Sequence, residues 1–184
     1  MKCSMPGASE LQGKKRRNGL EKSFPAGVLQ DLRSCAIRRK ALLRIAVIDG
    51  QGGGIGGAII KKIKEAYGEQ VEVWALGTNA IATAQMMKAG ANRGASGENA
   101  VCVCVRQVDV VAGPVSILMA QSMMGEVTPS MARAVGEAEA VKLLLPLSQE
   151  SIAIVGAVRE PLPHLVEKLV CDHLSAFVHR KESR

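Results

Sequence analysis

The stretch that decides the fold runs from residue 44 to residue 57 and reads Arg44-Ile45-Ala46-Val47-Ile48-Asp49-Gly50-Gln51-Gly52-Gly53-Gly54-Ile55-Gly56-Gly57. A short apolar run ends in an aspartate, and six glycines then follow within eight residues. Apolar side chains next recur every four residues, at Ile55, Ile59, Ile63 and Tyr67, as they do on one face of a helix. The stretch therefore predicts a strand, a glycine turn and a helix, in that order.

A glycine turn that leads into a helix is a typical binding site for an anion. Glycine has no Cβ, so its backbone can adopt positive φ and can approach a ligand closely. The first turn of a helix also leaves N–H groups unpaired at the positive end of the helix dipole. We therefore expect a phosphate or nucleotide here; the alternative is that the glycines only let helix and strand pack closely. The predicted cofactor-binding residues of the turn are Gly50, Gln51, Gly52, Gly53, Gly54, Ile55 and Gly56.

Two glycine spacings in the turn bear on the cofactor. Gly52-x-Gly54-x-x-Gly57 matches the dinucleotide fingerprint, and Gly50-x-x-x-Gly54-Ile55-Gly56 resembles the glycine pattern of short-chain dehydrogenases. The second predicted strand, however, ends without the acidic residue that binds an adenosine ribose. The dehydrogenase Tyr-x-x-x-Lys and the P-loop lysine are missing as well. A nucleotide or dinucleotide remains possible, and the sequence leaves the cofactor unknown.

The composition favours a single α/β domain. Hydrophobic residues make up 47% of the 184 residues, but aromatic residues make up only 2%. The core must therefore consist of Val, Ile, Leu, Ala and Met, which suits parallel strands covered by helices. The scarcity of aromatic residues also argues against a protein that binds single-stranded nucleic acid by base stacking.

The positive charge is concentrated at the start of the chain. Residues 1–44 carry 11 Lys and Arg and 3 Asp and Glu, a net charge of +8, whereas the remaining residues carry 13 and 14, a net charge of −1. We expect residues 1–43 to be a basic leader, largely disordered or partly helical, and residues 44–180 to be a Rossmann-like ligand-binding domain. Whether the leader is functional or reflects a misplaced start stays open. Nucleic-acid binding is expected, if at all, only through this leader.

Cysteine usage and hydropathy bear on location and on metal binding. The five cysteines are an odd number without a Cys-x-x-Cys pair, which favours reduced thiols in a cytoplasm. Cys102 and Cys104 lack two further ligands at suitable spacing, so no metal site is predicted. Neither a membrane span nor a secretion signal is evident.

Strands and helices alternate along the rest of the chain. This alternation predicts a Rossmann-like three-layer sandwich with a mostly parallel sheet of about five strands. Thr78 or Asn79, Ser96 and Thr128 are the predicted caps of the second, third and fifth helices. The predicted strands are 44–49, 71–76, 108–112, 141–145 and 152–155; the predicted helices are 55–67, 80–89, 97–106, 115–124, 129–138 and 161–178.

Polar residues at the carboxyl ends of the predicted strands are candidates for the site, because ligands bind there in parallel sheets. Asp49 would bind a hydroxyl or a magnesium ion, act as a base, or cap the N–H groups of the turn. Thr78 and Asn79 follow the second strand and would bond a ligand hydroxyl or cap the next helix. Together with Gly113 they belong to the predicted cofactor-binding set.

A second polar group lies between the glycines of segment 90–99. Arg93 would hold a carboxylate or phosphate bidentately, and Glu98 would act catalytically or orient Arg93. Asn92 joins the cofactor-binding set. The alternative is that this segment only begins a helix.

Two further titratable residues, His164 and Glu126, lie in segments that follow predicted strands. His164, at the start of the last helix, can titrate near neutrality. Glu126, beside Gly125, is interpreted as a solvated turn carboxylate in preference to an acid or base. The candidate catalytic residues are therefore Asp49, Arg93, Glu98 and His164.

An ordered set of segments resembles a small bacterial family of uncharacterised proteins over about residues 44 to 172. These segments are Val47-Ile48-Asp49-Gly50-Gln51-Gly52-Gly53-Gly54-Ile55-Gly56, Ala75-Leu76-Gly77-Thr78-Asn79-Ala80, Gly90-Ala91-Asn92-Arg93-Gly94, Gly97-Glu98-Asn99-Ala100, Gly113-Pro114, Gly125-Glu126-Val127-Thr128-Pro129 and Leu144-Leu145-Pro146-Leu147. The resemblance implies a Rossmann-like fold. It implies neither an activity nor a catalytic residue.

The leading hypothesis is a cytoplasmic protein that binds a nucleotide or another phosphorylated small molecule at the glycine turn. The alternatives are a non-catalytic regulatory module that uses the same cleft and a nucleic-acid-associated protein that acts through its leader. Whether the chain is an enzyme stays open, because a fold alone does not decide it. A homo-oligomer is also possible, since the apolar stretch 115–124 suits either a core helix or a dimer face.

Overall fold

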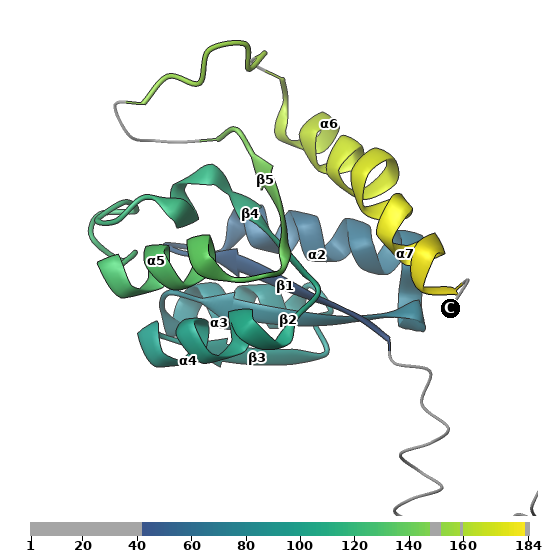
Figure 1. The fold of residues 1–184 in the computed structure, drawn as a ribbon, viewed down its shortest axis with the longest axis horizontal. Helices are drawn as coiled ribbons and strands as arrows, with labels where there is room; N and C mark the ends of the chain where they lie inside the picture. Colours follow the sequence, from purple (N-terminus) through teal and green to yellow (C-terminus); the bar gives the residue numbers. More distant parts are fainter. Residues whose placement is uncertain (1–41, 148–151, 159, 183–184) are drawn as a thin grey trace, which may run out of the picture. The chain divides into compact units, whose positions relative to one another are not determined.

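The structure is a computed structural model that describes residues 42–147, 152–158 and 160–182 (Figure 1). The expected leader, apart from its last two residues, lies outside the described residues. The predicted first strand begins one residue earlier than expected, at Leu43.

The sheet has five strands, all parallel, in the order β3-β2-β1-β4-β5. This is the strand order of a Rossmann-like fold, so the predicted fold class is confirmed. The central strand β1 pairs with β2 from Leu43 to Asp49 and with β4 from Ile45 to Val47. The strands are β1 (Leu43–Asp49), β2 (Val71–Gly77), β3 (Arg93–Ser96), β4 (Val110–Pro114) and β5 (Val141–Leu145).

The helices connect the strands and close the described chain. The α-helices are α2 (Gly54–Tyr67), α3 (Ala80–Lys88), α4 (Glu98–Cys104), α5 (Pro129–Glu137), α6 (Leu162–Glu167) and α7 (Ser175–Glu182). Short 3₁₀ turns are η2 (Gly68–Gln70), η3 (Val105–Gln107) and η4 (Val115–Leu118), and a π-helical stretch, η5 (Lys168–Leu174), joins α6 to α7. None of the helices in this part of the chain is both long and apolar enough to span a membrane.

Three predicted helix ends are confirmed by their contacts. The Asn79 side chain accepts a hydrogen bond from the Ala82 N–H at 2.8 Å and so caps α3. Thr128 caps α5 in the same way, accepting from the Met131 N–H at 3.2 Å. Gly68 follows α2, adopts a φ of 50° and ends that helix.

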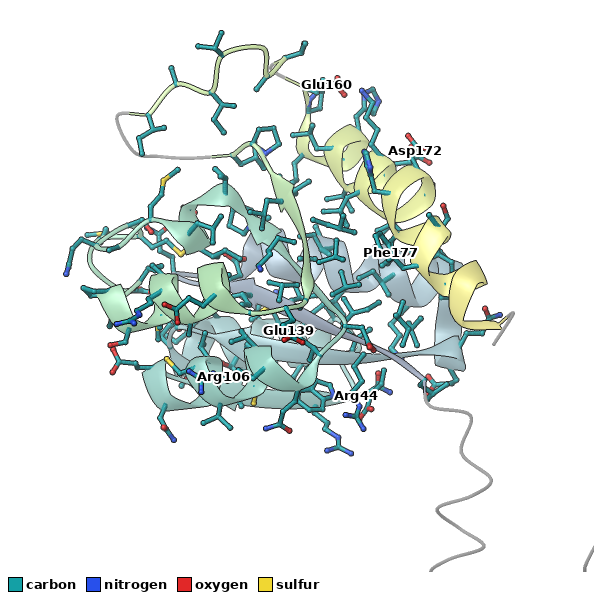
Figure 2. The ribbon with its side chains drawn as sticks, in the orientation of Figure 1. Arg44, Arg106, Glu139, Glu160, Asp172 and Phe177 are labelled. Carbon is teal, nitrogen blue, oxygen red and sulfur yellow. The ribbon has the colours of Figure 1, made fainter. Side chains whose placement is uncertain are left out.

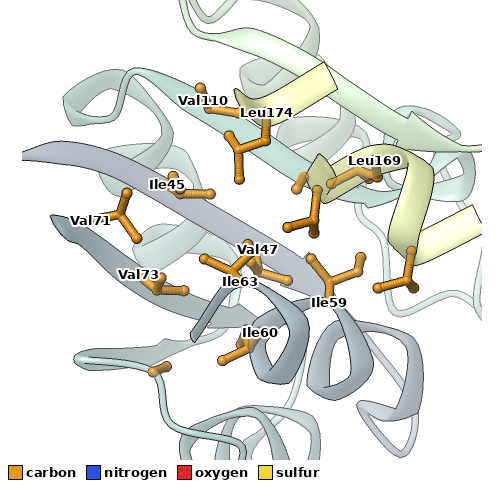
Figure 3. Packing of buried hydrophobic residues seen from close by; sticks show 14 of the residues in the cluster. Ile45, Val47, Ile59, Ile60, Ile63, Val71, Val73, Val110, Leu169 and Leu174 are labelled. Carbon is orange, nitrogen blue, oxygen red and sulfur yellow. The ribbon is translucent and has the colours of Figure 1, made fainter. Parts of the chain in front are cut away.

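Alternate residues of the strands build two apolar layers, one on each face of the sheet. Ile45 and Val47 of β1 pack with α2, α3, α6 and η5 on one face (Figure 3). Ala46 and Ile48 pack with α4 and α5 on the other face. The sheet is therefore covered on both sides, as all-parallel sheets require.

One strand of the sheet, β3, lies in a polar segment where no strand was predicted. The segment 152–155 was predicted as a strand because it is apolar, but residues 152–154 form no strand and Val155 begins a turn. The edge strand β3 lies instead within the glycine-rich segment 90–99. An edge strand has one neighbour and little burial, so it lacks the apolar run that marks a central strand.

The predicted apolar helix 115–124 is also wrong. Only η4 is helical, and its end is fixed by the Ser116 carbonyl, which accepts bonds from the Met119 N–H at 3.0 Å and the Ser122 hydroxyl at 2.7 Å. A hydroxyl that bonds a nearby carbonyl competes with helix propagation in this way.

Two further local predictions need correction. Ser96 does not cap α4, because it ends β3 and the residue before α4 is Gly97, whose φ is 90°. The strand predicted at 108–112 lies two residues later, so Gly113 and Pro114 belong to β4.

Replacing Ile59 with Ala is expected to lower the free energy of unfolding by about 2–5 kcal/mol, because a fully buried side chain leaves a cavity between α2 and the sheet. Ile81→Ala is the matched control, since Ile81 is a helical isoleucine that is 72% exposed. Its effect should stay within about 0.5 kcal/mol. Urea unfolding of both variants measures the difference, and equal losses would contradict this packing.

Candidate functional site

The crevice of the sheet lies between the carboxyl ends of β1 and β4. From β1 the chain moves to β2 and β3 on one side, and it then returns to β4 and β5 on the other. This reversal of strand order is the point at which Rossmann-like sheets bind their ligands. The glycine turn, residues 50–53, lies here between β1 and α2.

Asp49 is the polar residue around which the turn is built. The residue is 4% exposed, and its carboxyl Oδ1 accepts from the Gly50 N–H at 2.8 Å and Oδ2 from the Gly56 N–H at 2.6 Å. Burial raises the pKa of this carboxyl, whereas the N–H groups of Gly56, Gly50 and Ile55 lower it and the nearby Glu126 raises it further; the net direction is upward. Of the roles weighed from the sequence, these contacts match the cap of the turn.

Glu126 is a second carboxylate that holds the turn from outside. Its Oε2 accepts from the Gln51 N–H at 2.8 Å, from the Asn79 amide at 2.8 Å and from the Thr78 hydroxyl. Burial raises the pKa of Glu126, but these three bonds outweigh it and hold the pKa below its usual value. We call this network of Glu126, Gln51, Thr78 and Asn79 the Glu126 bridge.

The sequence interpretation of Glu126 as a solvated turn carboxylate is therefore wrong. The side chain is partly buried, and it joins the segment between η4 and α5 to the ends of β1 and β2. Its partners lie 47 to 75 positions away along the chain, so no local pattern marks the bridge.

The segment that carries Glu126 has an unusual backbone. Gln121, Met123 and Met124 adopt φ values of 69°, 55° and 60°, in the left-handed region that side chains other than Gly and Asn rarely enter. Such strain persists only where the surrounding structure fixes it. Here the segment is held against the turn: a Cβ added to Gly50 would lie 2.6 Å from Sδ of Met123 and 2.8 Å from Oε2 of Glu126.

Three glycines of the stretch 50–56 have a structural reason to be glycine. Gly50 lies against the Glu126 segment, and Gly53 adopts a φ of 69° with Ala82 close by. A Cβ at Gly56 would lie 2.4 Å from Sδ of Met86 and 2.8 Å from Cβ of Asp49. These three positions support the expectation that glycines let helix and strand pack closely.

Gly52 and Gly54 have no such reason. Both are exposed, both lack the left-handed φ, and a Cβ at either would meet nothing within 4 Å. In the described part of the chain, no residue accepts a hydrogen bond from either N–H, whereas the Gly53 N–H donates to the Gly50 carbonyl at 2.9 Å. At the amino end of α2, a helix of 14 residues, two N–H donors therefore have no acceptor among the described residues.

A cavity of about 730 Å³ opens beside the turn. Its walls come from the ends of β1, β4 and β5, from the segment 152–158 and from α6. Asp49, Ser116 and Glu160 are its polar side chains among the described lining residues, apart from Gln51 of the turn. Glu160 lies just before α6 (Figure 2) and accepts from Nζ of Lys168 at 2.6 Å.

The predicted cofactor-binding residues fall into four groups, of which the first, Gly52, Gly53, Gly54 and Gly56, is the set of turn glycines that do not line the cavity. Gly50, Gln51 and Ile55 line the cavity, while Thr78 and Asn79 belong to the Glu126 bridge.

The other two predicted cofactor-binding residues have structural roles in the sheet. The Gly113 backbone lies so close to β1 that a Cβ would be 2.4 Å from the Ile48 carbonyl oxygen. Asn92 extends the sheet, accepting from the Val73 N–H through its side chain and donating its own N–H to the Val73 carbonyl, both at 2.8 Å.

Arg93 does not face the glycine turn. It pairs in register with Trp74, three residues before β2 ends, and its Nε lies 2.9 Å from Oε1 of Glu72. Its guanidinium stands 5.5 Å from the centre of the Trp74 ring. Arg44 (Figure 2) contacts Glu72 as well, so Arg93 belongs to a surface ion-pair cluster.

The remaining two candidate catalytic residues are exposed. Glu98 begins α4 directly after Gly97, whose N–H donates to the Gly77 carbonyl at 2.9 Å. His164 lies in α6, whose Leu162 and Leu165 line the cavity. Within the described ranges, no three His, Cys, Asp or Glu residues gather in a way that would hold a metal ion.

The strand order and the glycine turn at the switch point define a Rossmann-like α/β domain. Residues 44–178 match a family model described as "Domain of unknown function (DUF3842)", and the chain belongs to that family. Comparison with curated proteins and with solved structures gave no match.

Gly56→Ala is expected to lower the free energy of unfolding by about 1–3 kcal/mol, because the new methyl group overlaps Met86 and the Cβ of Asp49. Gly57→Ala is the matched control: its Cβ would make an ordinary contact at 3.9 Å, so the better helix former should be neutral or stabilising by up to about 1 kcal/mol. Denaturant unfolding measures both. Similar values for the two variants would contradict the close packing at Gly56.

Glu126→Gln is expected to lower the free energy of unfolding at neutral pH and to lose this deficit in acid. The native pKa of Glu126 lies below its ordinary value of 4.5. At a pH between these two pKa values, the native state therefore binds fewer protons than the unfolded state. The stabilisation by the carboxylate is therefore complete above the ordinary pKa and declines as the pH falls through the native pKa.

Urea unfolding of both proteins from about pH 7 to about pH 3 measures this difference. Glu137→Gln, at an exposed ion pair on α5, serves as control and should change stability by at most about 1 kcal/mol. A deficit of Glu126→Gln that stays constant with pH would argue against the bridge.

Proposed function

We propose that the protein binds a nucleotide or another phosphorylated small molecule at the glycine turn, with a phosphate oxygen accepting from the N–H groups of Gly52 and Gly54. One observation carries this proposal. These two glycines are exposed, their positions leave room for a Cβ, and their N–H groups have no acceptor in the described part of the chain. A ligand that approaches the backbone closely would explain why both positions are glycine.

The electrostatics of the turn support a phosphate at its exposed rim. The amino end of α2 carries the positive end of the helix dipole, which attracts anions. Asp49 accepts hydrogen bonds from the N–H groups of Gly50 and Gly56, and Glu126 accepts one from the N–H group of Gln51. The donors that remain at the rim, Gly52 and Gly54, would bind the phosphate.

The Glu126 bridge favours a compact ligand over an extended dinucleotide. In dinucleotide-binding domains, an acidic residue at the end of the second strand bonds the adenosine ribose. Here Thr78 and Asn79 occupy that place, and both donate to Glu126 instead. A ligand of mononucleotide size or smaller would leave these bonds intact.

The same contacts favour a binding module over a catalyst. Both oxygens of Asp49 accept from backbone N–H groups, so protonation of the carboxyl would weaken the bonds that hold the turn. Oε2 of Glu126 already accepts three bonds. This supports the regulatory ligand-binding alternative, in which the chain senses the ligand without converting it.

Thermal unfolding of the full chain with NAD, NADP, ATP, nucleoside monophosphates and sugar phosphates tests the proposal. A ligand at a hundredfold its Kd should add about 2.7 kcal/mol of stability. We expect at least one phosphorylated compound to raise Tm, and we expect mononucleotides or sugar phosphates to exceed NAD.

Gly54→Val should abolish this response while the protein stays folded, because the side chain enters open space in the free protein and covers the donor. Gly136→Val is the matched control, since Gly136 is an exposed helical glycine of α5 whose Cβ also meets nothing within 4 Å. The proposal would be refuted if no compound raised the Tm of the folded wild-type protein, or if Gly54→Val bound the compounds as well as the wild type.

A further inference from the structure

The cavity beside the turn has the size and position of a small-molecule site. Its volume of about 730 Å³ falls within the range of about 300–1,000 Å³ that such sites occupy. Gln51 and Ile55 line it, and these residues flank the rim donors Gly52 and Gly54. A ligand whose phosphate lies at the rim would therefore direct the rest of its structure into the cavity.

Most of the described side chains that line the cavity are apolar. Ile55 of α2 and Met123 contribute from the turn side, Leu147 follows β5, and Leu162 and Leu165 come from α6. Binding is favoured when apolar groups of a ligand displace water from such surfaces. They suit an aliphatic or aromatic body.

The charged groups of the cavity are carboxylates in the described residues. Asp49 is buried, and both its oxygens accept from N–H groups. Glu160, just before α6, pairs with Lys168. Neither offers a hydrogen-bond donor to an anion when ionised. An anionic body would meet repulsion from both, so the body that fits is uncharged.

The segment 152–158 exposes apolar side chains where it borders the cavity. Ile152, Ile154 and Val158 line the cavity while remaining 48%, 41% and 70% exposed. Contiguous exposed apolar groups typically mark a binding surface. An apolar body in the cavity would cover part of this surface and would give these residues a partner.

We propose that the cavity binds the uncharged, apolar body of the ligand, so that the ligand class is a phosphate ester of an aliphatic or aromatic alcohol. This inference rests on the proposed phosphate site for its polar end. The cavity itself carries the apolar end, through Ile55, Leu147, Ile154 and Leu165.

Isothermal titration of the full chain with inorganic phosphate, butyl phosphate, hexyl phosphate and hexan-1-ol tests the inference. Each methylene buried in the cavity should tighten binding about fourfold. Hexyl phosphate is therefore expected to bind at least about tenfold more tightly than butyl phosphate, and inorganic phosphate most weakly of the three. Equal affinities for inorganic, butyl and hexyl phosphate would overturn the inference.

A matched pair of variants locates the apolar end. Ile154→Asp places a charge on the cavity wall and should weaken hexyl phosphate at least about tenfold while leaving inorganic phosphate unchanged. Val155→Asp places the same charge on the next residue, which is fully exposed and does not line the cavity, and should change neither affinity. Equal effects of the two variants on hexyl phosphate would overturn the inference.

The alcohol separates this inference from the proposed function. If hexan-1-ol binds as tightly as hexyl phosphate and Ile154→Asp weakens both, the apolar cavity stands and the phosphate site fails. If all three phosphates bind equally and Gly54→Val abolishes their binding, the phosphate site stands and the apolar cavity fails. The chain-length series uses only the wild-type protein, so a variant that does not fold leaves the test intact.

Discussion

The site depends on one buried carboxylate and the N–H groups that it accepts from. Asp49 ends the central strand, and its two oxygens accept from Gly50 on one side of the turn and from Gly56 in the first turn of α2 on the other. This contact fixes the path of the turn, the direction in which α2 leaves the sheet, and the donors that remain for a ligand. An uncompensated carboxylate would be costly at this depth, and the three N–H groups that face it lower that cost. The backbone N–H groups of Gly50 and Gly56 and the carboxylate of Asp49 therefore fix the turn together.

The second carboxylate extends this arrangement across the top of the sheet. Glu126 reaches the turn from the segment after η4 and joins the ends of β1 and β2. Its pKa shifts downward while that of Asp49 shifts upward, because Glu126 is less deeply buried and its hydrogen bonds outweigh desolvation. Two carboxylates near one helix terminus thus leave the exposed N–H groups of Gly52 and Gly54 for the proposed anion. The cavity on the side of β4, β5 and α6 is available to the rest of the proposed ligand.

Local signals in the sequence predicted the parts of the fold that local chemistry determines. The strand–turn–helix unit, the Asn79 and Thr128 caps and the strand at Val141–Leu145 all have short-range signatures. The failures have a common cause, because they concern neighbours that a sequence does not display. The segment 152–155 is apolar yet has no adjacent strand, and β3 is polar yet pairs with β2. The prediction for Glu126 was wrong for the same reason, and Arg93, which was predicted to hold a carboxylate or phosphate, is held beside Trp74 by the register of its strand.

The two carboxylates also differ in how far along the chain they reach. The Asp49–Gly56 contact closes a loop of 7 residues, whereas the Glu126–Gln51 contact closes one of 75 residues. Loop closure entropy rises with the logarithm of length, so the second closure costs about 2 kcal/mol more than the first. The contact between Asp49 and Gly56 therefore forms between residues that are close in the sequence. The contact between Glu126 and Gln51 depends on β4 and on the segment after it being in place. A substitution far from the turn that loosens that segment would change the shape of the proposed ligand site without replacing one of its glycines.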